Sequence, residues 1–331
     1  MTLHSASTNT GSAARTDVRS AAEAGPVPRR GGQSPRRRGW RFVWLLLGLA
    51  AVGWGGSIRV STGPAAGIGL CGASRHGQRV HHAATPGPVA ACPARLRLAS
   101  FNIHTARGTD GREDLSRIAR LLRGFDLVGL NEVRGPYWWE RRDQASLLAE
   151  QLRVPWLFAP AERRWLYGEF GNGVLSRLPC KAWQRIPLAR THGKSFRNVL
   201  LVQVEWQGGP LNVLITHLDR RSDHDRREQL CTVGALFLAL AEPAVLMGDL
   251  NTPRSDPALA DLLRSPTVVD PLAELQPGGP DHIDWILIRG LRPIAGGLVR
   301  TVASDHPLVW VEVEPPQAVK PVEAAAAAQP W

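Results

Sequence analysis

Cysteine is scarce in this sequence, and no two cysteines have the spacing of a metal or redox motif. The 331 residues include four Cys, and none of them forms a C-x-x-C pair. This excludes a disulfide-stapled miniprotein and a zinc ribbon. The apolar content of 44% with 21% charged residues also excludes a wholly disordered or collagen-like protein. The length allows one large domain with tails, or two small domains.

Acidic residues are nearly missing from the N-terminal third, and this explains the basic character of the chain. The formal net charge is +11. Residues 1–41 carry +6 of it, residues 42–94 carry +3 without a single acid, and residues 95–331 carry only +2. Because the electrostatic footprint of a nucleic-acid-binding protein lies on the binding domain, the total charge is no argument for such binding by the folded part.

Long apolar runs are missing as well, with one exception. Residues 42–58 form a run of 17 residues without charge, near the lower limit for crossing a bilayer. Four Arg precede the run within residues 36–41, and only Arg59 follows closely. The positive-inside rule predicts a single-pass signal anchor, with residues 1–41 as a disordered cytoplasmic tail and the remaining chain outside the cytoplasm. A cleaved export signal, which would leave a secreted protein, is the alternative.

Two further segments lack hydrophobic periodicity. Residues 59–94 are rich in Gly, Ala, Pro and His and are predicted to form a flexible linker. The linker contains Cys71 and Cys92, which could pair in an oxidising compartment. Cys180 and Cys231 are instead expected in the core as small apolar residues. Residues 315–331 form a low-complexity tail, predicted to be disordered.

Residues 95–314 have the pattern of a mixed α/β domain. Apolar segments typical of strands lie at 96–102, 126–130, 199–205, 211–216, 244–247, 284–288 and 307–313. Between them, apolar residues recur at helical spacing around residues 115–122, 145–152 and 233–240. Asp256 followed by Pro257 is expected to begin another helix. About 220 residues are enough to bury a large core.

Several of these strands end in polar side chains. They are Asn102, Glu132, His217, Asp249 with Asn251, Asp284, and the Asp305-His306 pair that precedes the last strand. Such residues at one end of several strands indicate a site built on a rigid sheet. Oxygen donors such as Asn102, Glu132 and Asp305 suit a hard cation like Mg²⁺. A carboxylate at Asp284 would fix the His306 tautomer and raise its pKa, and the imidazolium could stabilise an anionic phosphorus centre.

The ordered motifs resemble those of the endonuclease/exonuclease/phosphatase superfamily. They are S-F-N-I-H, L-N-E-V, G-N-G-V-L-S-R, I-T-H-L-D, M-G-D-L-N, H-I-D-W-I and A-S-D-H-P-L, spread over about residues 95–314. The resemblance implies an α/β (α+β) fold, a four-layered sandwich of two mixed β-sheets packed face to face and flanked by helices. It also implies Mg²⁺- or Mn²⁺-dependent cleavage of phosphate esters.

The same resemblance implies roles for the residues that match the motifs. Glu132 would be the chief metal ligand, with Asn102 assisting and Asp305 in the metal site or directly behind it. Asp249 would position or deprotonate the attacking water, with Asn251 beside it.

The histidines would handle the phosphoryl group. By resemblance His306, held by Asp284, would support it, and His217 would contact it. Four weaker candidates for substrate binding complete the set: Asn172, Arg197, Arg226 and Gln229.

Together these features predict an enzyme. We expect a metal-dependent hydrolase that cleaves phosphate esters, with diesters preferred, by in-line attack of an activated water on a membrane-proximal or extracytoplasmic substrate such as a phospholipid. A membrane-tethered or extracellular nuclease acting on nucleic acid is the alternative, and the near-neutral charge of the domain argues against it. A third reading is an inactive binding module of the same fold, which the joint presence of Glu132, Asp249, Asn251 and His306 disfavours. No obligate protein partner is evident.

Overall fold

The computed structural model describes the chain at residues 41, 43–48, 59–70, 93–137, 140–165, 168–189, 192, 195–279 and 281–316. Two compact units are distinguished, Met1–Leu49 and Ala50–Trp331. In the first unit, residues 43–48 are helical. Among the described residues, no helix has the length and apolar character needed to cross a membrane. The predicted tails, most of the apolar run at 42–58 and the Cys71–Cys92 pair lie outside the described residues.

The described residues of the second unit form thirteen strands. In chain order they are β1 (Arg59–Ser61), β2 (Ala65–Gly67), β3 (Leu96–Asn102), β4 (Leu127–Arg134), β5 (Trp156–Arg164), β6 (Gly168–Ser176), β7 (Cys180–Pro187), β8 (Asn198–Trp206), β9 (Gly209–His217), β10 (Ala244–Asp249), β11 (Asp284–Arg289), β12 (Arg292–Val299) and β13 (Leu308–Glu314). They form a seven-stranded sheet of order β1-β5-β6-β4-β3-β13-β12 and a six-stranded sheet of order β11-β10-β9-β8-β7-β2.

The described α-helices of the second unit each begin at a capping side chain, whereas its 3₁₀ helix does not. In chain order the helices are η1 (His104–Ala106), which is the 3₁₀ helix, α2 (Leu115–Leu121), α3 (Gln144–Leu152), α4 (Asp223–Ala239), α5 (Pro257–Leu263) and α6 (Pro271–Leu275). Asp256 accepts a hydrogen bond from the backbone of Ala258, with Pro257 at the first helical position, which confirms the predicted helix start. The expected core position of Cys231 is wrong, because this residue lies on the exposed side of α4.

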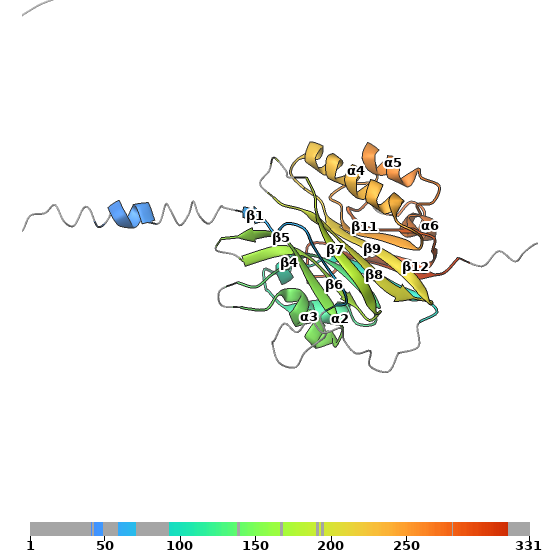
Figure 1. Ribbon diagram of the computed structural model, residues 1–331, viewed down its shortest axis with the longest axis horizontal. Helices are drawn as coiled ribbons and strands as arrows, with labels where there is room; N and C mark the ends of the chain where they lie inside the picture. Colours follow the sequence, from blue (N-terminus) through green and yellow to red (C-terminus); the bar gives the residue numbers. More distant parts are fainter. Residues whose placement is uncertain are drawn as a thin grey trace, which may run out of the picture. The chain divides into compact units, whose positions relative to one another are not determined.

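The two sheets pack face to face, with helices on both outer surfaces (Figure 1). The central core joins side chains of both sheets, such as Leu98 and Val174 from one and Val213 and Met247 from the other. A second cluster lies between the seven-stranded sheet and α2 and α3, and a third between the six-stranded sheet and α4 and α5. Strands with two buried faces explain the continuous apolar runs of the sequence. The predicted four-layered α/β sandwich is confirmed.

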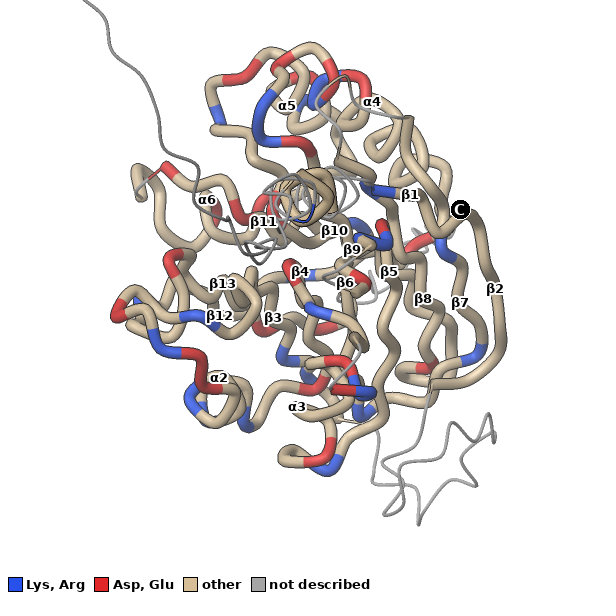
Figure 2. The backbone as a smooth tube through the Cα atoms, turned by 90° about the vertical axis from the view of Figure 1, so that its left-hand side faces the viewer, with Lys and Arg blue, Asp and Glu red and all other residues tan. Residues whose placement is uncertain are grey.

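The linker predicted at 59–94 is wrong for residues 59–70, which belong to the folded unit. β1 pairs with β5 at the edge of the seven-stranded sheet, and β2 pairs with β7 at the edge of the six-stranded sheet (Figure 2). Between them, Thr62 donates its backbone N–H to Ala161, and Arg185 donates to the carbonyl oxygens of Thr62 and Gly63. This segment therefore joins the edges of both sheets. Its short Gly- and Ala-rich strands carry too little periodicity to be recognised in the sequence.

Candidate active site

Three strands of the six-stranded sheet bring their polar ends together. β9 and β10 are parallel, and His217 lies beside Asp249 in the register. β11 is antiparallel to β10, and its first residue, Asp284, pairs with Asp249 from the other side. All three side chains are buried. The strand arrangement alone therefore places two carboxylates and an imidazole next to one another.

Asp249 also contacts the other sheet. Its Oδ2 accepts a hydrogen bond from Nδ2 of Asn102 at 2.9 Å. It lies 3.4 Å from Nε2 of His217 and 3.8 Å from Nε2 of His306. Burial disfavours the charged carboxylate and the nearby charge of Asp284 adds to this, so the pKa of Asp249 is raised well above its usual range. A carboxylate with a raised pKa is suited to accept a proton from water near neutral pH.

The loop after β10 is fixed around Asp249. The backbone N–H of Asn251 donates to Oδ1 of Asp249 at 2.9 Å, and Asn251 Nδ2 donates to the carbonyl oxygen of Leu218 at 3.1 Å. Asn251 has a φ of +49°, a left-handed conformation that asparagine tolerates better than most residues. The structure thus places Asn251 beside Asp249, as predicted from M-G-D-L-N.

His306 and Asp284 form the predicted pair. Nδ1 of His306 lies 2.8 Å from Oδ2 of Asp284, which therefore accepts the Nδ1–H. Burial disfavours the charged ring, but the hydrogen bond and the charge of Asp284 outweigh it and raise the pKa of His306 to about 9. The ring is thus an imidazolium at neutral pH, with Nε2–H directed toward Asp249.

His217 is a neutral donor. Nη1 of Arg197 lies 3.0 Å from Nδ1 of His217, so Nδ1 accepts and the ring hydrogen resides on Nε2. Burial and the positive charges of Arg197 and His306 lower the pKa of His217 well below its usual value. Within the described part of the chain, Nε2 of His217 is buried without a hydrogen-bond partner. It can donate to an oxygen of a substrate placed beside Asp249, and Arg197 acts by fixing its tautomer.

Glu132 lies in an irregular part of β4. The register between β4 and β6 shifts between Leu130 and Val133, and Glu132 has a φ of +55°. Such a bulge takes a residue out of the ladder and redirects its side chain. Oε1 of Glu132 lies 3.3 Å from Nδ2 of Asn102, the same amide nitrogen that contacts Asp249. Asn102 thus links Glu132 to Asp249.

The orientation of the Asn102 amide is fixed by its neighbour. Its Oδ1 accepts the backbone N–H of His104 at 3.0 Å, which leaves the Nδ2 donors facing Glu132 and Asp249. In this arrangement Asn102 presents hydrogen-bond donors to the carboxylates. It orients them, and Glu132 offers the oxygens for a cation.

Asp305 lies at the exposed rim of the candidate site, beside His104, a residue that was not predicted from the sequence. Nδ1 of His104 is 3.2 Å from Oδ1 of Asp305, and these side chains are 41% and 52% exposed. Residues 104–106 all have positive φ although none is glycine, a strained conformation typical of functional loops. The available signal was the place of His104 in S-F-N-I-H, two residues after Asn102.

Asn172 belongs to a buried amide network behind the site. Nδ2 of Asn131 donates to Oδ1 of Asn172 at 2.8 Å, and Nδ2 of Asn172 donates to Oδ1 of Asn198 at 2.9 Å. Oδ1 of Asn131 accepts the backbone N–H of Asp249 at 2.9 Å. Asn172 therefore supports the position of Asp249 through Asn131. Asn131 was missed as a supporting residue, although it stands in the L-N-E-V motif.

Arg226 and Gln229 face other partners. Nη2 of Arg226 donates to Asp223 at 2.6 Å within α4. Oε1 of Gln229 accepts the backbone N–H of Asp219 at 2.9 Å, and its Nε2 donates to the carbonyl oxygen of Ala189 at 3.3 Å. Gln229 thus holds the loop before α4 and the loop after β7, and neither side chain is brought to Asp249.

The donor set fits a hard divalent cation. Glu132 and Asp305 offer partly exposed carboxylates near the buried Asp249 and Asp284, and a cation would offset this negative charge. Among the described residues, Oδ1 of Asp284 is buried without a hydrogen-bond partner. Asp249, Asp284 and His306 are close enough to hold an ion. The hydrogen bond between His306 and Asp284 already occupies one atom of each, whereas the partly exposed carboxylate of Glu132 could hold a cation.

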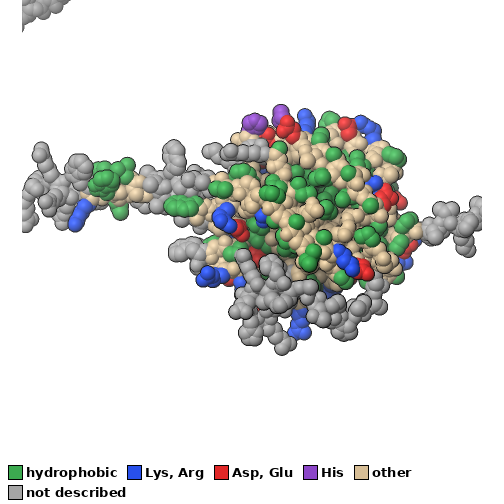
Figure 3. Space-filling view, viewed as in Figure 1, with side chains coloured by type: hydrophobic (Ala, Val, Ile, Leu, Met, Phe, Trp, Pro, Cys, Tyr) green, Lys and Arg blue, Asp and Glu red, His purple; other side chains and the backbone are tan. Residues whose placement is uncertain are grey.

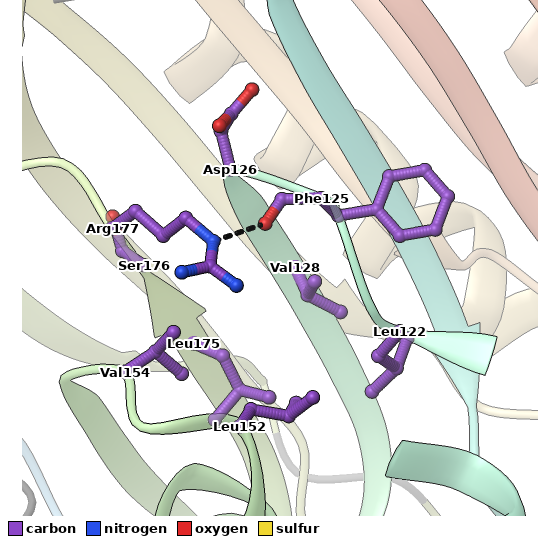
Figure 4. A pocket seen from close by; sticks show the side chains of 9 residues that line it. All are labelled: Leu122, Phe125, Asp126, Val128, Leu152, Val154, Leu175, Ser176 and Arg177. Carbon is purple, nitrogen blue, oxygen red and sulfur yellow. Dashed lines mark hydrogen bonds between the residues drawn. The ribbon is translucent and has the colours of Figure 1, made fainter. Parts of the chain in front are cut away.

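A pocket and a cleft lie outside this group of residues. A small apolar pocket between β4 and α3 is lined by Leu122, Leu152 and Val154, with Nε of Arg177 donating to the carbonyl oxygen of Phe125 at 3.2 Å (Figure 4). It holds none of the predicted site residues. A larger cleft of about 520 Å³ is lined by residues that include Arg254 and His282. Nδ1 of His282 lies 2.7 Å from the carbonyl oxygen of Asp284, so the cleft borders the catalytic residues.

Solved structures with the same fold were found, whereas no curated protein matches the chain. An endonuclease/exonuclease/phosphatase from Beutenbergia cavernae DSM 12333 is 28% identical, with a TM-score of 0.56, covering 67% of this chain and 72% of that one. A humanized TDP2 of D. rerio is 21% identical, with a TM-score of 0.52, covering 67% and 100%. A mannosyl-6-phosphatase of Bacteroides thetaiotaomicron VPI-5482 is 17% identical, with a TM-score of 0.52, covering 66% and 99%.

The sequence model described as the Endonuclease/Exonuclease/phosphatase family matches residues 99–306. This range spans Asn102, Glu132, Asp249 and His306, and enzymes of this family depend on divalent metals. The chain therefore belongs to the endonuclease/exonuclease/phosphatase family.

Proposed function

We propose that this protein hydrolyses a phosphodiester, by in-line attack of a water that Asp249 deprotonates. The observation that carries the proposal is the convergence on Oδ2 of Asp249 of a neutral donor, His217, and a cation, His306. A base between two donors is suited to take a proton from water while the donors contact the phosphoryl oxygens. A divalent cation bound at Glu132, Mg²⁺ or Mn²⁺, would supply Lewis-acid stabilisation of the charge on phosphorus.

Each of the other residues has a part in this reaction. Asn102 holds the carboxylates of Glu132 and Asp249 in place, and Asp284 keeps His306 protonated. Asn131 fixes the backbone of Asp249 from behind. The cleft beside Asp284 is suited to the group attached to the phosphate, with Arg254 and His282 in its wall. These contacts allow proton transfer without large movements.

The substrate that we propose is a phospholipid or another phosphodiester near a membrane. Support comes from where the chain joins the domain after the apolar run at 42–58. Arg59 pairs with Arg164 at the end of β5, and Arg164 pairs with Gly168 at the start of β6. Phe170 pairs with Arg134 of β4, two residues beyond Glu132. Arg59, the first described residue after the run, therefore lies at the same end of the seven-stranded sheet as Glu132.

The test is a hydrolysis assay of the full chain with Mg²⁺ or Mn²⁺. Bis-nitrophenyl phosphate, nitrophenyl phosphate, a phosphocholine diester in vesicles and plasmid DNA would be compared, each with Asp249→Ala as control. We expect metal-dependent cleavage of the diesters, fastest for the lipid, that EDTA and Asp249→Ala abolish. Preference for DNA would establish a nuclease, preference for the monoester a phosphatase, and inactivity of the folded chain on all four would contradict the proposal.

A further inference from the structure

A second group of metal-ligating side chains lies outside the catalytic centre, at the start of α4. Its members are two imidazoles and two carboxylates, those of His192, His224, Asp225 and Glu228. Figure 3 shows histidine side chains at the upper edge of the molecule, next to carboxylates. The site residues of the phosphoesterase do not include any of these four, so their proximity calls for its own explanation.

Three of the four side chains lie close enough to hold one ion, and His192 contacts one of these three, Asp225. One ligand atom each of His224, Asp225 and Glu228 lies within 4.8 Å of the others. Nδ1 of His192 is 2.7 Å from Oδ1 of Asp225, and the rings of His192 and His224 have centroids 6.2 Å apart. His224 and Glu228 are one helical turn apart and therefore share a face of α4.

One ligand is fixed and the others can adjust. Asp225 is buried, its backbone N–H donates to Oγ of Ser222 at 3.2 Å, and its Oδ2 accepts the backbone N–H of His192 at 2.9 Å. The side chains of His192, His224 and Glu228 are 85%, 71% and 59% exposed. They can change rotamer around a cation at Asp225 without disturbing the core.

We propose that His192, His224, Asp225 and Glu228 form a second cation site, for a borderline divalent ion such as Zn²⁺. Two imidazole nitrogens with carboxylate oxygens are a ligand set typical of zinc, whereas Mg²⁺ prefers oxygen ligands. The site differs in this respect from the carboxylate-rich catalytic centre, and it does not depend on the proposed phosphodiesterase activity.

His192 lies in the loop between β7 and β8, so a cation bound to it would also hold this loop. The backbone N–H of Leu188 donates to the carbonyl oxygen of Arg197 at 2.9 Å, which closes a loop that contains His192. The loop is held to α4 by Gln229 at Ala189 and by Asp225 at His192. A cation shared by His192 and α4 would fasten the loop whose last residue, Arg197, sets the tautomer of His217.

Metal binding tests the proposal directly. The full chain, stripped with a chelator, would be titrated with Zn²⁺ against a chromophoric competitor, and with Co²⁺ followed by visible absorption. We expect one equivalent to be lost, or weakened at least tenfold, in both His192→Ala and His224→Ala. Asp223→Asn, which changes a neighbouring carboxylate outside the cluster, is the matched control and should bind as the wild type does. Circular dichroism would confirm that each variant is folded.

A second measurement follows the loop itself. The sequence has trypsin sites at Arg190 and Lys194. We expect Zn²⁺ to slow cleavage at both sites in the wild type and to have no such effect in His224→Ala. Equal stoichiometry and affinity in all variants would overturn the proposal and leave an ion pair between His192 and Asp225. Loss of the equivalent only in Cys231→Ser would overturn it as well, by assigning the zinc to that exposed thiol.

Discussion

Asp249 is the residue whose removal should affect catalysis most. Its carboxylate contacts Asn102, His217 and His306. We expect Asp249→Ala to lower kcat by about 10²–10⁴-fold, the range for loss of a general base. Steady-state kinetics on a soluble diester would measure this. Asp223→Asn, on the surface of α4, should leave kcat unchanged, and a loss below tenfold in Asp249→Ala would exclude Asp249 as the base.

The pair of His306 and Asp284 predicts the pH dependence. Because the pKa of His306 is raised to about 9, activity that needs the imidazolium should fall as the pH rises through about 9. In Asp284→Asn the hydrogen-bonded charge is lost while burial remains, so the pKa of His306 falls and the descending limb moves to lower pH. Profiles of kcat/KM against pH measure the shift. Asp305→Asn, more exposed, should shift the limb less, and an unchanged limb in Asp284→Asn would contradict this role.

A sequence motif predicts where a residue lies along a strand or helix, but not which distant residues it contacts. Strand-end positions such as Asp249 and His217 were predictable, because the carboxyl ends of adjacent parallel strands meet. Contacts across the two sheets, such as Asn102 with Asp249, depend on packing between segments 147 residues apart. Arg226 was one of the weaker substrate-binding candidates, yet its partner is Asp223 within the same helix. The spacing of residues along a helix does not show which part of the protein each face of the helix contacts.

At the scale of elements, two of the strands missed in the sequence have few fully buried residues. β7 consists of half-buried and exposed residues, and β12 is mostly half-buried and contains Gly296 and Gly297. β10, inside its sheet, and β11, at the edge of the same sheet, are buried along their whole length and were predicted within a few residues. Burial on both faces produces the continuous apolar run that a sequence shows plainly.

The segment with β1 and β2 should stabilise the folded unit. Without it, β5 and β7 become open sheet edges, and the core loses Leu70. We expect a fragment of residues 93–316 to have a lower melting temperature than a fragment of residues 59–316. A net loss of about 3 kcal/mol would follow from several hydrogen bonds, which lowers Tm by roughly 6–12 °C. Calorimetry and light scattering would measure melting and aggregation. Equal Tm values would show that this segment is only attached, without a role in stability.

At the scale of the whole molecule, the net positive charge is concentrated in the N-terminal part of the chain. The first 94 residues carry +9 of the net +11, and the remaining chain is close to neutral. A near-neutral catalytic domain has little counterion release to gain from a nucleic-acid backbone. The basic flank ahead of the run at 42–58 instead favours a cytoplasmic N-terminus, which would leave the catalytic domain on the other side of the membrane.

The proposed membrane anchor at residues 42–58 predicts an effect on turnover. In proteoliposomes, the full chain should hydrolyse a phosphodiester lipid of its own bilayer faster than residues 59–316 added from solution, because tethering raises the effective concentration of substrate. Both proteins should cleave soluble bis-nitrophenyl phosphate at the same rate, since the catalytic residues lie after residue 59. Lipid release and nitrophenol absorbance provide the two rates. If the full chain is no faster than residues 59–316 on the lipid, and equally fast on the soluble diester, the phosphodiesterase activity stands and the proposed membrane substrate is rejected.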